Sequence, residues 1–134
     1  METRAKNRQP RRGEFTRSII GGFFEVYNEL GYGLLESVYA SALEYELRSR
    51  GHIVEREFWT DVFYKGQPVA RQRLDMIVDG AVVIEIKATE QLPPFARRQL
   101  LTYLTVTRLE LGLVLHFVPE AKVHRLVQSR VQRI

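Results

Sequence analysis

Apolar residues recur at helical spacing through the first third of the chain. Between residues 15 and 30 they are followed directly by Gly31, and between residues 34 and 50 by Gly51. An apolar stripe of this period that ends at a glycine is typical of an amphipathic helix with a glycine near its C-terminal cap. The pattern therefore predicts two helices, over residues 15–30 and 34–50.

The pattern changes near Ile53, where β-branched and aromatic residues become frequent. Three stretches of this kind cover residues 53–64, 69–78 and 82–87, and turn-forming residues lie at 65–68 and after residue 78. Short stretches of such residues between glycine-containing turns are typical of antiparallel strands. We therefore expect a meander of three strands.

The last part of the chain returns to a helical period and then to strands. Pro93 and Pro94 suit the first turn of a third helix, residues 111–118 indicate a strand buried on both faces, and residues 122–127 can add an edge strand. The order is thus α-α-β-β-β-α-β-(β). Because a helix connects the third and fourth strands, these two can run parallel. The expected fold class is α/β, with a single central mixed sheet flanked by helices.

The hairpin between the second and third strands decides which polar residues meet. A three-residue loop at 79–81 places Leu74 and Met76 on an apolar face and opposes Asp75 to Glu85, whereas a two-residue loop opposes Asp75 to an isoleucine. We favour the three-residue loop because it separates apolar from polar side chains.

Two opposed carboxylates repel each other, and a cation between them removes that cost. Oxygen ligands of this kind suit Mg²⁺ or Mn²⁺, so Asp75 and Glu85 are candidate metal ligands. Lys87 shares the face of Glu85 and can orient a water or contact a phosphate. The alternative is a solvated strand face on which Lys87 and Arg73 neutralise the acids.

Three further polar residues lie on predicted helices. Glu36 is four residues before Ala40, at the border of the face that packs on the sheet, and Gln99 and Tyr103 are four residues apart. The simpler interpretation is a boundary glutamate and a tyrosine with its ring in the core. We expect instead that Glu36, Gln99 and Tyr103 border the cleft of the strand acids.

The net charge of +4 is concentrated in residues 1–12, where five basic residues face one acid, so the other 122 residues balance. We expect a basic, disordered leader at residues 1–13 and one domain at 14–134. The leader is either a solvated tail or an arm along a phosphate backbone. The aromatic residues around Trp59 can stack on bases or belong to a core or a dimer interface.

The composition excludes several kinds of site. The chain has no cysteine and three histidines, which excludes a disulfide framework, a thiolate zinc site and an all-histidine metal cage. Nucleotide-binding glycine motifs, HExxH and the Gly-x-Ser-x-Gly elbow are all missing. No apolar run approaches the roughly 20 residues of a membrane span, so we expect a cytoplasmic protein without a membrane partner.

Four segments resemble one known family. Residues 33–39, GLLESVY, match the signature of the GxxExxY proteins, and the resemblance continues through RQRLD at 71–75, VIEIKA at 83–88 and RRQLLTYL at 97–104. It covers about residues 15–127. That family is assigned to the PD-(D/E)xK nuclease superfamily, so the resemblance implies a restriction-endonuclease-like core of order α-β-β-β-α-β.

The resemblance also implies roles for single residues. Asp75 and Glu85 would be the metal-binding acids, Lys87 the motif lysine and Glu36 a helix-borne acid that assists the metal site. Leu74 stands where many members have proline. The pair Gln99 and Tyr103 resembles the Gln-x-x-x-Tyr pair of RecB-like nucleases.

The functional hypothesis is a Mg²⁺- or Mn²⁺-dependent phosphodiesterase that acts on nucleic acid. We favour DNA over RNA as the substrate and expect selection by structure rather than by sequence. Asp75, Glu85 and the Ile86 carbonyl would hold the metal. The phosphate contacts would come from arginines, namely Arg73, Arg97, Arg98 and Arg108. The alternatives are a domain that binds nucleic acid or protein without cutting, and a subunit that cuts only as a homodimer or within a larger nuclease or helicase assembly.

Overall fold

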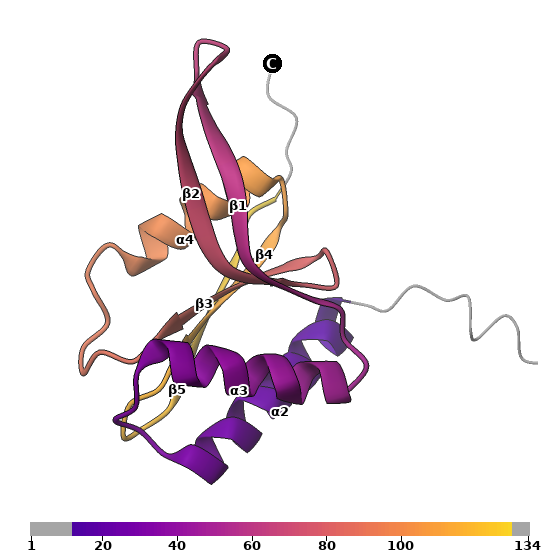
Figure 1. Cartoon of the computed structure of the whole chain (residues 1–134), viewed down its shortest axis with the longest axis vertical. Coiled ribbons are helices and arrows are strands. Elements are labelled where there is room, and N and C mark those ends of the chain that lie inside the picture. The colour runs from indigo at the N-terminus through magenta and orange to yellow at the C-terminus, as the bar shows by residue number, and fades with distance from the viewer. Residues whose placement is uncertain (1–11, 130–134) are drawn as a thin grey trace, which may run out of the picture.

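The computed structural model describes residues 12–129 and contains three helices and five strands in that range (Figure 1). In chain order these are α2 (Arg12–Leu30), α3 (Glu36–Ser49), β1 (Val54–Tyr64), β2 (Gln67–Val78), β3 (Val82–Lys87), α4 (Ala96–Thr107), β4 (Leu111–His116) and β5 (Lys122–Val127). This confirms the predicted order, including the edge strand. No helix within residues 12–129 is long and apolar enough to cross a membrane.

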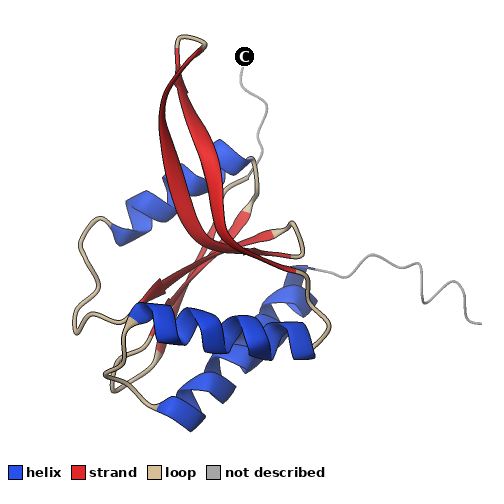
Figure 2. Ribbon diagram, in the orientation of Figure 1, coloured by secondary structure: helices blue, strands red, loops and turns tan. Residues whose placement is uncertain are grey.

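The five strands form one mixed sheet in the order β1-β2-β3-β4-β5. Only β3 and β4 run parallel, because α4 connects them across one face of the sheet. The helices α2 and α3 lie on one side of the sheet and α4 lies on the other (Figure 2). The fold therefore has the predicted three layers, with a separate apolar core on each side of the sheet.

The two cores follow from the alternation of side chains along the buried strands. On β4, Leu111, Leu113 and Leu115 pack towards α2 and α3, whereas Val114 packs towards α4. Gly112 also faces α4, and a Cβ atom there would come within 2.8 Å of the Leu100 side chain. The missing side chain at Gly112 therefore lets α4 lie directly on the sheet.

Element ends differ from the prediction in four places. Helix α2 already includes Arg12 and Gly13, which the sequence interpretation assigned to the leader, while residues 1–11 lie outside the described range. Helix α4 begins at Ala96, after the two prolines, and β4 ends at His116. The β1–β2 turn contains only Lys65 and Gly66, both with positive φ, which matches the twist of a two-residue hairpin.

The alternation of β2 breaks at Asp75. We expected Leu74 to share a face with Met76, but Leu74 packs in the core next to α4 while Met76 packs in the core next to α2 and α3. Across the hairpin, Glu57 lies opposite Asp75 and has φ 52°, in the left-handed region. A left-handed residue turns the following side chains over, and Phe58 accordingly packs on the α4 side.

A polar network joins three segments outside the two cores. His52 lies 2.7 Å from the Ser18 hydroxyl of α2 and 2.6 Å from the Asp79 carboxylate in the β2–β3 loop. The other oxygen of Asp79 accepts the Ile53 N–H at 2.8 Å. The network therefore ties α2 and the start of β1 to the loop that sets the β2–β3 register.

Candidate active site

The pairing of β2 and β3 stops where the two acids meet. The paired residues are Met76–Ile84, Ile77–Val83 and Val78–Val82, which confirms the three-residue loop. Beyond them, the Ile86 N–H donates to the Asp75 carboxylate at 2.8 Å, and the Asp75 N–H donates to the Glu85 carboxylate at 3.4 Å. Each carboxylate thus takes a backbone hydrogen bond from the opposite strand, and the two acids occupy the fork where the strands separate.

Burial makes this acid pair costly to ionise. Glu85 is 5% exposed, and its burial, followed by the charge of Asp75, raises its pKa to about 8. Burial also raises the pKa of Asp75, and the Glu36 carboxylate adds to that rise. The backbone hydrogen bonds lower both pKa values but do not cancel the effect of burial. The pair therefore favours a shared proton or a bound cation.

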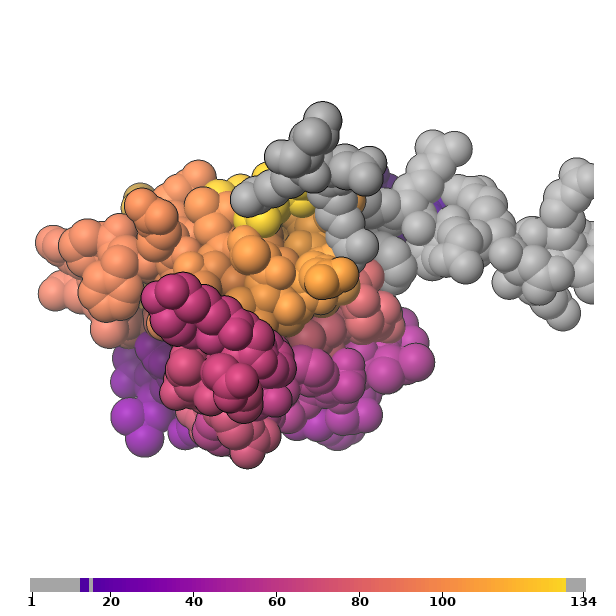
Figure 3. Space-filling view, turned by 90° about the horizontal axis from the view of Figure 1, so that it is seen from above, coloured from indigo at the N-terminus to yellow at the C-terminus, as the bar shows by residue number. Residues whose placement is uncertain are grey.

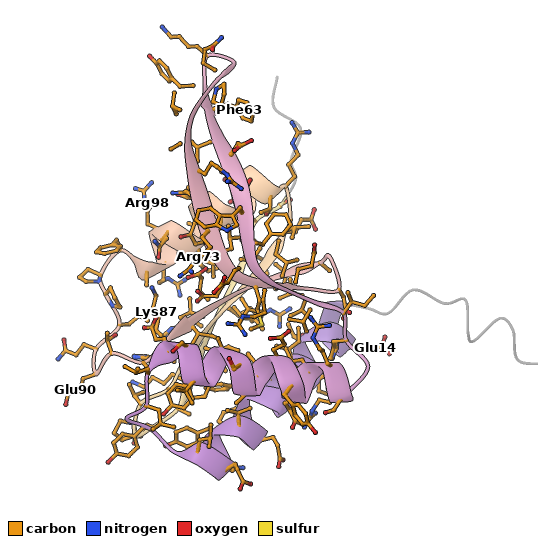
Figure 4. All side chains as sticks on the ribbon, viewed as in Figure 1. Glu14, Phe63, Arg73, Lys87, Glu90 and Arg98 are labelled. Carbon is orange, nitrogen blue, oxygen red and sulfur yellow. The ribbon has the colours of Figure 1, made fainter. Side chains whose placement is uncertain are left out.

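Glu36 and Lys87 reach the fork from different elements. Glu36 begins α3, and its carboxylate accepts the Ala88 N–H at 3.1 Å, just after the end of β3. The half-buried Lys87 ends β3, and its charge lowers the pKa of both Asp75 and Glu85. Figure 4 shows Lys87 and Arg73 above the start of α3. The structure therefore brings Glu36 and Lys87 to the acid pair.

The turn before α3 explains the Gly-x-x-Glu-x-x-Tyr spacing in physical terms. The Tyr39 hydroxyl donates to the Gly31 carbonyl at 2.8 Å and accepts the Leu34 N–H at 3.2 Å. Gly33 has φ 100°, where a side chain would strain the backbone. Glycine and tyrosine thus fix the turn that sets Glu36 at the first position of α3.

Tyr103 approaches the acids from the α4 side of the sheet. It is 5% exposed, and burial, followed by the charges of Glu85 and Asp75, raises its pKa to about 12. Gln99 lies one turn earlier on α4 and is half-buried. Its side chain makes no hydrogen bond to any residue between 12 and 129. The structure therefore brings Tyr103, and not Gln99, into electrostatic contact with the acids.

A pocket opens onto the fork from the α3 side. Its lining residues come from α3, β1, β2 and β3 and are Glu36, Ser37, Ala40, Arg56, Glu57, Arg73, Asp75 and Ile86. Glu85, Lys87, Gln99 and Tyr103 do not line it, so of the four residues that we expected to border the cleft of the strand acids, Glu36 alone reaches this pocket. The pocket gives a ligand access to Asp75 and Ile86.

Comparison with known proteins agrees with this geometry. Residues 13–130 match the family described as the PD-(D/E)XK nuclease superfamily. The chain belongs to this superfamily. The crystal structure of SSO0001 is similar in fold, with a TM-score of 0.54 and 21% sequence identity over 69% of this chain. The match covers 49% of SSO0001, so the chain spans about half the length of that protein. No curated protein matches the chain.

The PD-(D/E)XK superfamily typically uses divalent metals, and the donor atoms at the fork suit one. Within residues 12–129, no group of three or more histidine, aspartate or glutamate side chains is arranged to hold a metal. Mg²⁺ needs fewer than three such side chains, since it binds through one or two carboxylates and completes its coordination shell with waters and substrate phosphates. The Ile86 N–H points to Asp75, and the Ile86 carbonyl points the same way because both groups of a strand residue face one neighbour. Asp75, Glu85 and this carbonyl therefore fit a hard cation.

The predicted phosphate-binding arginines do not form one group. Arg73 lines the pocket, and its charge lowers the pKa of Asp75. Arg97 and Arg98 are exposed at the start of α4, while Arg108 follows its last residue, about 16 Å further along the helix axis. Only Arg73 is therefore placed beside the acids.

Two charged residues of the pocket were missed by the sequence interpretation. Arg56 donates to Glu44 of α3 at 2.9 Å, and its buried Nε has no hydrogen-bond partner within residues 12–129. Glu57 pairs with Arg73 at 3.5 Å. Nothing in a strand sequence marks Glu57 for a positive φ, so only the fold reveals that these residues line a pocket with Asp75.

Proposed function

We propose that this protein is a Mg²⁺-dependent nuclease that hydrolyses phosphodiester bonds in DNA. The observation that carries the proposal is the fork, at which Asp75 and Glu85 each accept a backbone N–H of the opposite strand, with Lys87 two residues after Glu85. A divalent cation at such a site polarises a phosphate and lowers the pKa of a water. Membership of the PD-(D/E)XK superfamily supports the same reaction class.

The residues around the fork have separate proposed roles. Asp75, Glu85 and the Ile86 carbonyl hold the cation, and Lys87 orients the attacking water or contacts the phosphate. Glu36 positions the end of β3 through the Ala88 N–H and adds negative charge on the pocket side.

Tyr103 and Gln99 complete the proposed machinery on α4. Tyr103 is buried within electrostatic range of Glu85 and Asp75, and Gln99, one turn before it, supplies an amide to substrate once substrate is bound. We also place the chain among the GxxExxY proteins within the superfamily. That assignment is supported by Gly33, Glu36 and Tyr39, whose spacing the turn before α3 requires.

The proposed substrate is DNA selected by its structure. Arg73 contacts the phosphate next to the scissile one, and Arg97, Arg98 and Arg108 contact phosphates further away. Phosphate contacts position nucleic acid without reading its sequence. Because the last three arginines are spread along α4, they suit an extended or branched substrate better than a short one.

The test is cleavage of labelled single-stranded, duplex, flapped and four-way-junction DNA with Mg²⁺ or Mn²⁺. Wild type should cut at least one substrate, and Asp75→Ala or Lys87→Ala should lower the rate by 100-fold or more, because each removes a group that acts in the transition state. Glu120→Ala and Lys122→Ala, at exposed positions, are the matched controls and should retain the rate.

A different result would favour the alternative function. If wild type binds these DNAs without cutting any of them in either metal, the protein is a binding subunit or needs a partner. Cutting that survives Asp75→Ala would place the reaction elsewhere in the molecule and contradict the proposed site.

A further inference from the structure

The β1–β2 hairpin projects beyond the helices and exposes one face. Trp59 and Arg73 lie directly opposite each other in the register, as do Asp61 and Arg71, so all four share this face. Trp59 is 50% exposed, and the side chains of Arg71 and Arg73 are 64% and 51% exposed. We call these four residues the outer hairpin face; the opposite side of the hairpin lies towards α4 (Figure 3).

Arg71 and Trp59 form a preorganised aromatic and cationic pair. The Arg71 guanidinium lies over the Trp59 ring, 4.9 Å from its centroid. The acidic neighbours are Asp61, 3.7 Å from Arg71, and Glu57, 3.5 Å from Arg73. Exposed ion pairs of this kind contribute about 0–1 kcal/mol, so a phosphate can displace them at little cost.

The outer hairpin face leads directly to the fork. Arg73 belongs both to this face and to the pocket lining, next to Asp75. Arg73 and Asp75 are two positions apart on β2, which is about 7 Å along the strand. Phosphates of a stacked strand follow one another about every 3.4 Å along its axis, so this distance corresponds to about two nucleotides. A strand whose phosphate lies at Asp75 can therefore place a nucleotide about two positions away at Trp59, which lies opposite Arg73.

We propose that the outer hairpin face binds a single-stranded segment of the nucleic acid that enters the fork, with a base stacked on Trp59 and phosphates on Arg71 and Arg73. This inference rests on the proposed function and names the form of its substrate. A half-exposed indole can stack only on a base whose face is free, and the bases of a duplex are stacked on one another. The structure thus favours single-stranded regions, such as flaps and ends, over continuous duplex.

A second copy of this chain is a poorer occupant of the same face. A symmetric dimer would bring the outer hairpin face, which carries two arginines and one aspartate, against the same net positive surface of a second copy. Like charges across an interface oppose association. Nucleic acid supplies the opposite charge and an aromatic surface together.

The test uses the fact that Trp59 is the only tryptophan in the chain. The full chain is titrated in EDTA with a 12-nucleotide single strand and with its duplex, and tryptophan fluorescence is recorded. We expect quenching by the single strand, and at least tenfold weaker binding of the duplex. Trp59→Ala should weaken binding of a labelled single strand by roughly tenfold, measured by anisotropy.

Two variants separate the phosphate contacts from the aromatic contact. Arg71→Ala should weaken binding and reduce the slope of log affinity against log salt by about 1, as expected for one lost phosphate contact. Lys122→Ala removes an exposed charge from β5 and should leave both quantities unchanged. Far-UV circular dichroism checks that each variant is folded.

Three results would overturn the inference: no quenching by single strands, equal affinity for the duplex, or unchanged affinity in Trp59→Ala. A blue shift of the emission with protein concentration, together with dimers in sedimentation, would assign the face to a second copy instead. Because binding is measured without metal, the outcome is independent of cleavage. If wild type shows quenching by the single strand but cleaves no DNA, the proposed reaction is contradicted and this binding site is still supported.

Discussion

Glu85 shows at the scale of a single residue how a site can oppose the stability of its own fold. Its carboxylate is buried between strands, next to Asp75, and its pKa is raised to about 8. A pKa that is higher in the folded than in the unfolded chain stabilises the fold at low pH only. The metal-free protein therefore loses stability as Glu85 is forced to ionise.

The first prediction concerns Glu85→Gln. The contribution of Glu85 to the free energy of unfolding is fully present below the unfolded-state pKa near 4.5. It is lost as pH rises through the folded-state pKa of about 8. The free energy of unfolding of Glu85→Gln, relative to wild type, should therefore rise by up to about 1.4 kcal/mol per pH unit across that window. Urea unfolding in EDTA at pH 5, 6, 7 and 8 measures it.

The matched control is Glu120→Gln, which makes the same chemical change at an exposed position. Its unfolding free energy relative to wild type should stay flat over the same range. A flat profile for Glu85→Gln as well would mean that the Glu85 carboxylate is solvated and that the fork is open in solution.

At the scale of the element, α4 packs closely against β4 because Gly112 has no side chain. Gly112 has the buried Leu100 above it, and an added Cβ would lie 2.8 to 3.0 Å from three Leu100 side-chain atoms. Leu100 has little room to move because it is fully buried. Tyr103 stands on the same helix, so the packing at Gly112 also sets the distance between this ring and Glu85.

The second prediction is that Gly112→Ala destabilises the protein by about 1–3 kcal/mol, because the core must shift to admit a methyl group. Thermal and urea unfolding measure the change. Gly13→Ala in α2 is the control: a Cβ there meets nothing within 4 Å, and alanine favours a helix, so its stability should be unchanged or higher. Equal stability of Gly112→Ala and wild type would show that α4 does not pack this closely.

At the scale of the whole molecule, the fork joins elements that are far apart in the chain. Glu36 comes from the helical first third, Asp75 and Glu85 from the meander, and Tyr103 from the helix on the opposite side of the sheet. A cation bound there is linked to folding, because the unfolded chain does not hold these groups together.

The third prediction is that Mn²⁺ or Mg²⁺ raises the melting temperature of wild type at pH 7.5. Saturation at 100 times the dissociation constant corresponds to about 2.7 kcal/mol. Asp75→Asn should lose this increase, while Asp61→Asn, an exposed aspartate on β1, should retain it. Calorimetry with and without EDTA measures the shift. An increase that persists in Asp75→Asn would place the metal at another site.

The sequence by itself determined the order of the elements, the mixed sheet and the three-residue loop. Apolar periods of 3.6 and 2 are local properties, and the loop follows from the need to keep apolar residues on one face. The candidate acids and Lys87 were also identified from local spacing. Other local inferences were wrong, since four element ends differ from the prediction and Leu74 packs in the core next to α4.

Only the tertiary structure decided how the site is arranged. The positive φ of Glu57 and the hydrogen bond from the Ile86 N–H to the Asp75 carboxylate accompany the reversal of faces in the hairpin. No local pattern marks either feature, because each depends on the opposite strand. Contacts between distant segments separate Tyr103 from the pocket, leave the Gln99 side chain without a hydrogen bond among residues 12–129, and bring Arg56 into the pocket that Asp75 lines. Spacing along the chain predicts which residues share an element, but only packing decides which elements meet.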